Sequence, residues 1–273
     1  MKKYLLSILI SVLFFGMRTT AQTVKEHGSG KLKIGIAAFT FRMFDIDSTL
    51  KMYKIADVKY MSVKDFHLPQ NSTKEQMEIF KQKCASYGVT PYALGPIYMK
   101  TKAEVDQTFD YVVRFGGKLL IGIPNYELLP YVEQKVKATG ITLAIHTHGP
   151  DKPIYPDAKD VYDRVKDMDP RIGICIDLGH TVRLGEDGAK DLLKYKDRIF
   201  DIHIKDVSGA SKETKTCEMG RGVMDFKPIL EALKTIDYKG VVSLEYEKDP
   251  DYPLFGVLES LGYLRGAMDV IFR

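Results

Sequence analysis

The segment RIGICIDLGH, residues 171–180, determines the architecture of this chain, because an apolar run ends there in a carboxylate and passes directly into Leu-Gly-His. The run at 171–177 has the length and composition of a buried parallel strand. The neighbouring runs repeat this design, with ITLAIH at 141–146 before it and IFDIHI at 199–204 after it. Each is a short apolar strand with a polar side chain at or near its end.

The same layout extends along the whole chain. Amphipathic segments separate the apolar runs, and the one at 73–88 begins with Thr, ends with Gly and carries apolar residues at helical spacing. Strand–helix alternation predicts a parallel sheet, and eight units predict a single closed (β/α)8 TIM barrel. An open doubly wound sheet is the alternative, but no GxGxxG motif follows the first strand. The expected strands are residues 32–41, 60–66, 89–97, 118–123, 141–146, 171–177, 199–204 and 241–246.

Residues 1–21 have the features of a cleaved signal peptide. A basic start (MKK) precedes the apolar run YLLSILISVLFFGM and a Thr-Thr-Ala cleavage site. An uncleaved membrane anchor is the alternative reading. We expect residues 22–31 to be a flexible lead-in and residues 32–273 to form the barrel domain. The protein is therefore predicted to be exported to the periplasm or the extracellular space, without membrane association after cleavage.

The composition argues against a nucleic-acid partner. The 40 basic and 36 acidic residues give a formal charge of +4, but the signal peptide holds three basic residues and no acid, which leaves 37 against 36. A near-neutral mature chain provides no basic surface. Three cysteines without a CxxC motif argue against a disulfide scaffold and allow at most one pair.

Histidines gather at the ends of the expected strands. Of the six in the chain, His67 follows the second strand, His146 and His148 close the fifth, His180 follows the sixth and His203 lies in the seventh. Active sites of TIM barrels lie at the C-terminal ends of the strands. Residues two apart in a strand point to the same side, so the two histidines of strand five share a face. This clustering is the main functional signal in the sequence.

Four polar side chains from strands five to eight form a candidate metal site: His146, Asp177, His203 and Glu245. A carboxylate that closes an apolar strand is costly to desolvate unless it is paired or bound to a metal. Adjacent strands lie about 4.8 Å apart, so inward side chains can converge on one cation. Two imidazoles and two carboxylates suit one divalent ion, namely Mn, Zn, Co or Fe. His148 is the substitute ligand if His146 points away. Taken alone, each histidine is more simply read as a hydrogen-bonded residue of the barrel rim, and Asp177 as the N-cap of the next helix.

Two further residues are placed to act at the same end of the barrel, where the C-terminal ends of the strands meet. Lys205 lies two residues after His203 and should lean toward the same side. Arg221, between two glycines in the long polar loop 208–226, is placed to reach a hydroxyl or an anionic group. Long loops at this end of a barrel are often substrate lids. The alternative for Lys205 is a salt bridge with Asp206 or another neighbour, and the alternative for Arg221 is simple solvent exposure.

Four motifs, in this order and spacing, resemble the xylose-isomerase-like TIM-barrel superfamily of sugar phosphate isomerases and epimerases. They are IDLGH (176–180), IHIKD (202–206), GRGVMDF (220–226) and GVVSLEYE (240–247). The resemblance covers the second half of the chain by motif and the first half by architecture only. It implies a divalent metal held by strands five to eight, with Asp177, His203 and Glu245 at three ligand positions. It also implies that His180 and Arg221 contact the substrate.

One departure from the family pattern lies in strand five. In the ketose epimerases this position is a glutamate that serves both as a ligand and as one of two acid/base groups, whereas this chain has His146. An imidazole can replace the ligand but not the second base. The resemblance then implies that Glu245 takes a proton beside a sugar carbonyl, and that His148 or Lys205 returns it or assists a leaving group. His180, Arg221 and His67 are the expected substrate-binding residues.

The sequence therefore predicts an exported, divalent-metal-dependent sugar isomerase or epimerase that uses enediolate chemistry. A lyase or dehydratase that acts on a keto-sugar or keto-glycoside through the same site is one alternative. A non-catalytic sugar-binding barrel is another. The expected partner is a small-molecule sugar or glycoside, since export argues against a sugar phosphate. A DNA-repair endonuclease would need a basic groove, which the near-neutral charge does not supply.

Overall fold

The computed structural model describes residues 32–273, which build a closed barrel of eight parallel strands. The predicted signal peptide (1–21) and lead-in (22–31) lie outside the described residues. In chain order the barrel strands are β1 (Lys33–Ala37), β2 (Tyr60–Val63), β3 (Thr90–Met99), β4 (Leu119–Pro124), β5 (Thr142–His146), β6 (Ile172–Asp177), β7 (Ile199–Ile204) and β10 (Val241–Leu244).

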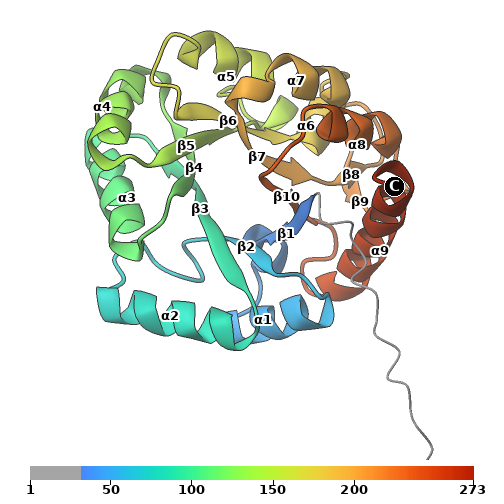
Figure 1. Ribbon diagram of the computed structural model, residues 1–273, viewed down its shortest axis with the longest axis horizontal. Helices are drawn as coiled ribbons and strands as arrows, with labels where there is room; N and C mark the ends of the chain where they lie inside the picture. Colours follow the sequence, from blue (N-terminus) through green and yellow to red (C-terminus); the bar gives the residue numbers. More distant parts are fainter. Residues whose placement is uncertain (1–31) are drawn as a thin grey trace, which may run out of the picture.

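The barrel closes because its first and last strands pair with each other. β1 is hydrogen-bonded in parallel to both β2 and β10, and the full order is β1-β10-β7-β6-β5-β4-β3-β2 (Figure 1). The prediction of a single (β/α)8 TIM barrel is confirmed, and the open-sheet alternative is wrong. In the long loop after β7, β8 (Asp206–Val207) and β9 (Thr216–Cys217) form a small antiparallel sheet of their own.

Helices surround the barrel on its outside (Figure 1). The sequence signals at their ends operate as expected: Thr73 and Gln76 form a capping box at the start of α2, and α3 ends at Gly116 with φ of 79°. No helix within residues 32–273 is long and apolar enough to cross a membrane. The helices are α1 (Ile46–Ile55), α2 (Lys74–Ser86), α3 (Lys102–Phe115), α4 (Leu129–Thr139), α5 (Ala158–Val165), α6 (Leu178–Arg183), α7 (Gly188–Lys194), α8 (Phe226–Thr235) and α9 (Pro253–Ile271).

Strand register brings the polar strand ends together at one mouth of the barrel. Asp177 of β6 lies opposite His203 of β7, and His203 in turn lies opposite Ser243 of β10. The backbone N–H of Glu245 donates to the carbonyl of Ile204, with 3.0 Å between N and O, which continues the pairing one residue beyond β10. The main apolar core fills the space between strands and helices. The interior of the barrel therefore holds a small cluster of apolar side chains and the polar residues described next.

Candidate metal centre and substrate cavity

Four buried side chains from four neighbouring strand ends approach one another at this mouth. His146, Asp177, His203 and Glu245 each offer one donor atom, and the four atoms lie within 4.8 Å of one another. His146 Nε2 lies 3.1 Å from His203 Nδ1 and 3.7 Å from Asp177 Oδ2, and His203 Nδ1 lies 3.3 Å from Glu245 Oε1. Donors on one tetrahedral zinc, at bond lengths of about 2.0–2.2 Å, lie roughly 3.3–3.6 Å apart. The spacing therefore fits coordination of a single ion.

The charges around these donors also fit a divalent cation. The carboxylates of Asp177, Glu245 and Glu247 surround one ammonium group, that of Lys205. When the three acids are ionised, two negative charges remain without a counter-charge in this group. Asp177 Oδ2, although 2.9 Å from Lys205 Nζ, receives no well-directed hydrogen bond from any described residue. A buried carboxylate oxygen in this state is what a metal ligand provides before the ion binds.

A second layer of polar side chains lies behind His203, whose buried Nε2 makes no well-directed hydrogen bond to any described residue. Its Nε2 faces Asp201 Oδ2 at 3.5 Å, and the other oxygen of Asp201 accepts a hydrogen bond from the Tyr92 hydroxyl at 2.9 Å. The Tyr92 hydroxyl also lies 2.7 Å from Ser243 Oγ. Because Nε2 faces Asp201, Nδ1 is left to face the other three donors, as in carboxylate–histidine–metal arrangements. Sequence reasoning missed Asp201, although an acid two residues before His203 in an apolar strand was a usable signal.

Without an ion, His203 is the residue that carries a proton in this cluster. Burial alone would lower the pKa of His203, but the carboxylates of Glu245 and Asp201 raise it to about 9. An ion bound at Nδ1 would have to displace this proton, so metal binding and protonation are coupled here.

Cys175 lies next to this layer and is a weaker candidate ligand. Its thiol, together with His146 and His203, forms a second group of potential donors. Burial and the neighbouring Asp201 raise the pKa of Cys175, so the thiol stays protonated and contacts Asp201 Oδ2 at 3.5 Å. The three cysteines of the described chain are all free.

Lys205 is almost completely enclosed, with 1% of its side chain exposed. Its Nζ lies 2.9 Å from Asp177 Oδ2, 2.9 Å from Glu245 Oε2 and in contact with Glu247. Burial works against its charge, but these carboxylates raise the pKa of Lys205 well above its ordinary value. Lys205 is therefore an ammonium group inside the site. Its predicted alternative partner, Asp206, instead accepts hydrogen bonds from backbone N–H groups of the following loop.

Glu245 is held on both of its carboxylate oxygens. Oε1 lies 3.3 Å from His203 Nδ1, and Oε2 accepts from Lys205 Nζ at 2.9 Å. Burial alone would raise the pKa of Glu245, but Lys205 and His203 hold it well below the ordinary glutamate value. A carboxylate with so low a pKa is a good ligand and a weak base. The structure thus favours the ligand role of Glu245 over the base role that the sequence suggested.

Two neutral imidazoles stand beside the four donors. His148 Nε2 lies 2.9 Å from the Tyr98 hydroxyl, and its Nδ1 is buried without a hydrogen-bond partner among the described residues. Burial and the nearby His180 lower the pKa of His148 to about 4. His180 Nε2 lies 3.3 Å from Lys205 Nζ, and burial together with Lys205 lowers the pKa of His180 to about 3. Both rings are therefore neutral at pH 7 and can accept hydrogen bonds from a substrate.

A cavity of about 530 Å³ opens beside Lys205 and His180, and we call it the substrate cavity. Its volume falls within the range of about 300–1,000 Å³ that is usual for small-molecule sites. Part of its wall comes from the loop 208–226, which the sequence marked as a lid. Its polar lining includes His180, Arg183, Lys205, Lys215, Glu247 and Lys248.

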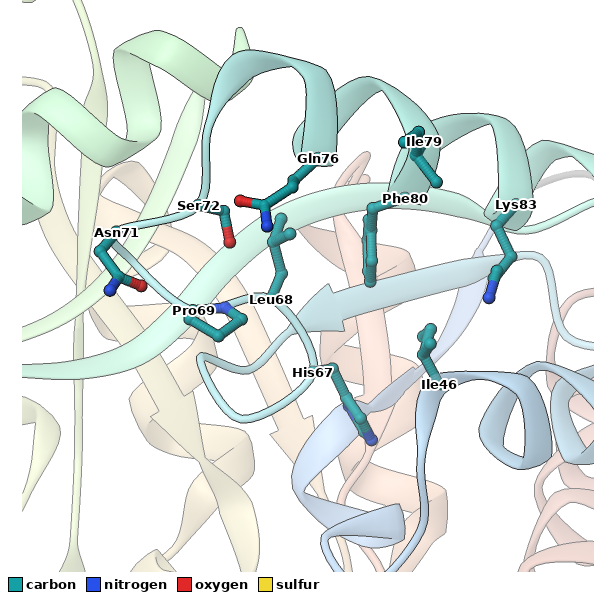
Figure 2. A pocket seen from close by; sticks show the side chains of 10 residues that line it. All are labelled: Ile46, His67, Leu68, Pro69, Asn71, Ser72, Gln76, Ile79, Phe80 and Lys83. Carbon is teal, nitrogen blue, oxygen red and sulfur yellow. The ribbon is translucent and has the colours of Figure 1, made fainter.

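Two predicted substrate-binding residues lie elsewhere. His67 Nε2 is hydrogen-bonded at 3.2 Å to Thr49 Oγ1 and lies 3.0 Å from the Phe44 carbonyl oxygen, and the residue lines a separate pocket against α2 (Figure 2). Arg221 is exposed and paired with Glu259 of α9, with 3.0 Å between Nη2 and Oε2. These partners belong neither to the four-donor cluster nor to the lining of the substrate cavity, so the structure does not bring His67 and Arg221 together with the other predicted site residues, and their contact with substrate stays a prediction.

Asp206 explains why the Arg221 side chain lies away from the substrate cavity. Its buried carboxylate accepts hydrogen bonds at 2.9 Å from the backbone N–H groups of Gly220 and Gly222, on either side of Arg221. A side chain at position 222 would collide with this carboxylate. The turn is therefore fixed by its own backbone, and the guanidinium lies on the outer side against α9.

Comparisons with known proteins agree with this architecture. A family model described as a xylose isomerase-like TIM barrel matches residues 52–267. An inosose dehydratase of Lacticaseibacillus casei is 35% identical over 127 residues, which cover 40% of this chain and 43% of that protein. The inosose dehydratase of Geobacillus thermodenitrificans strain NG80-2 is 33% identical over 119 residues, covering 37% of this chain and 40% of that protein. The chain thus spans about two fifths of the length of these curated relatives.

Solved structures share the fold over most of the chain. A protein from Parabacteroides distasonis ATCC 8503 superimposes with a TM-score of 0.68 at 25% identity, covering 86% of this chain and 99% of that one. The IolI protein, solved with a zinc atom, has a TM-score of 0.72 at 16% identity over 88% of this chain and 99% of its own. An L-ribulose 3-epimerase has a TM-score of 0.71 at 16% identity over 89% and 96%. The last two likenesses concern the fold alone.

Proposed function

This chain belongs to the xylose isomerase-like TIM barrel family, and on that basis we propose that it is a divalent-metal-dependent lyase or dehydratase acting on a keto-sugar, a keto-glycoside or a related cyclic polyol ketone. The enzyme removes a proton from the carbon beside the carbonyl and eliminates the oxygen substituent of the next carbon. One observation carries this choice: an ammonium group, Lys205, lines the substrate cavity beside Glu245, while strand five provides His146 at the position where the ketose epimerases have a glutamate.

Elimination and epimerisation make different demands on a site. Epimerisation needs a second group that delivers a proton to the opposite face of the same carbon. Elimination needs one group that accepts the carbon-bound proton and one that protonates the leaving oxygen. The site offers the neutral His148 and the charged Lys205, which match the second pair of demands. The relatives described as inosose dehydratases support the same choice.

In this proposal His146, Asp177, His203 and Glu245 hold the ion. When bound, the ion polarises the substrate carbonyl and makes the neighbouring C–H more acidic. His148 accepts that proton, and Lys205 gives one to the leaving hydroxyl or alkoxyl oxygen. The carbon–oxygen bond breaks as the carbon–carbon double bond forms, so a ketone becomes an unsaturated ketone plus water or an alcohol. His180, on the cavity wall, accepts a hydrogen bond from a substrate hydroxyl.

Product analysis tests the proposal and its alternatives together. The protein is loaded with Mn or Zn and incubated in deuterated water with inosose, 3-keto-sugars and 3-keto-glycosides. Ultraviolet absorbance of an unsaturated ketone together with released alcohol or water supports elimination. Deuterium at the carbon beside the carbonyl, with inverted configuration and no elimination, would show that the sequence-based isomerase or epimerase prediction was the better one. If neither product forms at full metal occupancy, the result favours the non-catalytic sugar-binding barrel.

Export is part of the proposal. The basic start, apolar run and Thr-Thr-Ala site support cleavage after Ala21 and a periplasmic or extracellular location. Mass spectrometry of protein purified from its native source should find Gln22 at the N-terminus, and an intact Met1 would contradict this.

A further inference from the structure

A second cavity, of about 500 Å³, lies at the same mouth of the barrel beside the loop that joins β10 to α9, and we call it the outer cavity. Two aromatic side chains in its wall are unusually open. Tyr252 is 78% exposed and Phe255 is 80% exposed, the highest values among the large apolar side chains of residues 32–273. Tyr252 immediately precedes α9 as its N-cap residue and Phe255 lies in the first turn of the helix, so the two rings come from one short segment of the cavity wall. Such exposed apolar surface beside a cavity is characteristic of a binding site.

The rest of the lining is acidic rather than apolar. Glu218, Asp249, Asp251 and Glu259 contribute carboxylates to the same cavity. Flat aromatic faces next to hydrogen-bond acceptors match the two sides of a sugar ring, whose C–H groups form an apolar face and whose rim consists of hydroxyl donors. Lys248 and Arg221 pair with Glu218 and Glu259, so Asp249 and Asp251 supply the remaining negative charge, which disfavours phosphorylated or carboxylated ligands because like charges repel. The chemistry of the outer cavity therefore suits a neutral sugar.

The outer cavity adjoins the substrate cavity. Asp249 lines both of them. Lys248 lines the substrate cavity and donates to Glu218, which lines the outer cavity, with Nζ–O distances of 2.9 and 3.1 Å. A ligand whose reacting ring lies against Lys205 can therefore extend across this ion pair to reach the two aromatic rings.

We propose that the outer cavity is a subsite for a second, neutral sugar ring, with Tyr252 and Phe255 as its stacking surface. The substrate is then a glycoside of at least two rings rather than a single sugar. The inference rests on the proposed function for the identity of the reacting ring, but the binding of the second ring depends only on the outer cavity. The competing occupant of the same surface is a second copy of this chain, which the test below distinguishes.

The absence of tryptophan from the chain provides a direct test. Tyr252→Trp keeps a stacking surface and introduces a single fluorophore into the subsite. Val270→Trp, at an exposed position near the other end of α9, is the matched control. Both variants are titrated, without added metal, with cellobiose, lactose and trehalose, with their 3-keto forms, and with methyl glucoside as the single-ring probe. We expect a saturable emission change for Tyr252→Trp only, with at least one disaccharide binding about tenfold more tightly than methyl glucoside, or about 1.4 kcal/mol.

A second variant locates the effect and separates the outcomes. Adding Phe255→Ala to Tyr252→Trp should weaken disaccharide binding about tenfold and leave methyl glucoside binding unchanged. Equal affinity for one and two rings, or no response to any sugar, overturns the subsite. Sedimentation of the wild type and of a Tyr252→Ser, Phe255→Ser variant tests the competing occupant. A dimer that dissociates in the variant, combined with no response to disaccharides, assigns the surface to contact between copies. Because binding is read without metal or turnover, failure of the elimination chemistry does not affect this result.

Discussion

Lys205 Nζ lies 2.9 Å from Glu245 Oε2, and the other oxygen of the same carboxylate lies 3.3 Å from His203 Nδ1. Glu245 is thus fixed between two cationic groups at the end of β10. This relationship favours a ligand role for Glu245, while Lys205 supplies one positive charge among three carboxylates and lines the substrate cavity. The predictions below separate these roles.

Replacement of Lys205 by Met should destabilise the protein more without metal than with it. The substitution keeps the volume but leaves Asp177, Glu245 and Glu247 without their ammonium partner. Loss of one partner from a buried ion pair typically costs about 3–5 kcal/mol, and a divalent ion can restore part of this. Thermal melts of Lys205→Met with a chelator and with excess Mn measure the difference. Lys215→Met, an exposed residue of the same cavity, is the control. An equal loss in both conditions would argue against a shared carboxylate site.

Substitutions at Glu245 and His148 should affect metal content and turnover differently. Glu245→Gln keeps the size but weakens the ligand, so the protein should lose metal on dialysis and lose activity with it. His148→Asn should keep its metal and lose activity by about 10²–10⁴, the usual effect of removing an acid/base group. Metal content by mass spectrometry and initial rates at matched occupancy provide the comparison. If Glu245→Gln at full occupancy loses as much activity as His148→Asn, the base role suggested by the sequence returns to Glu245.

Asp191 in α7 should make the folded protein less stable at neutral pH than in mild acid. Burial, together with the carboxylates of Glu186 and Asp157, raises the pKa of Asp191 to about 6, and its Oδ2 is buried without a hydrogen-bond partner among the described residues. The folded state therefore binds this proton more tightly than the unfolded state, whose pKa is near 3.8. Stability contributed by this residue rises as the pH falls from about 6 toward 3.8.

Asp191→Asn should accordingly raise the melting temperature at pH 7.5 and have a smaller effect at pH 5. The loss of a favourable charge near the helix N-terminus opposes part of the gain at pH 7.5, where Asp191 is ionised. Asp197→Asn, at an exposed carboxylate nearby, should show no such pH-dependent gain. A pH-independent effect of Asp191→Asn would contradict the assigned pKa.

The sequence predicted the barrel and the approach of four polar strand ends because both follow from local patterns. Apolar runs at regular intervals predict strands, and the period of two within a strand fixes which side chains share a face. His146, Asp177 and His203 needed only this rule and the parallel order of the strands. Loop residues follow no such rule. The direction of Arg221 could not be predicted, because the hydrogen bonds of Asp206 to the backbone on both sides determine where the turn points.

Contacts across the interior of the barrel were also beyond the reach of the sequence. Tyr92 of β3 reaches Asp201 of β7 across 109 residues of chain, which depends on barrel closure and strand register rather than on any local spacing. Glu247 was also missed, although it lies two residues after Glu245 and its carboxylate contacts the same Lys205, so the period of two was a usable signal here.

Asp201→Asn should weaken metal binding by about 10–100-fold, the usual effect of removing the partner of a metal-bound histidine. The variant keeps the shape of the side chain and its contact with Tyr92, but it removes the negative charge that faces His203 Nε2. Burial raises the pKa of Asp201, so the folded protein gains little from this carboxylate itself, and the melting temperature without metal should change little. A role in packing alone would instead lower the melting temperature and leave the affinity for metal intact.

Competition with a chelator measures the affinity for metal. Tyr92→Phe, one hydrogen bond further from the ion, should show a smaller loss of affinity. If Asp201→Asn binds Mn and Zn as tightly as the wild type while His203→Asn does not, then Asp201 does not orient the ligand.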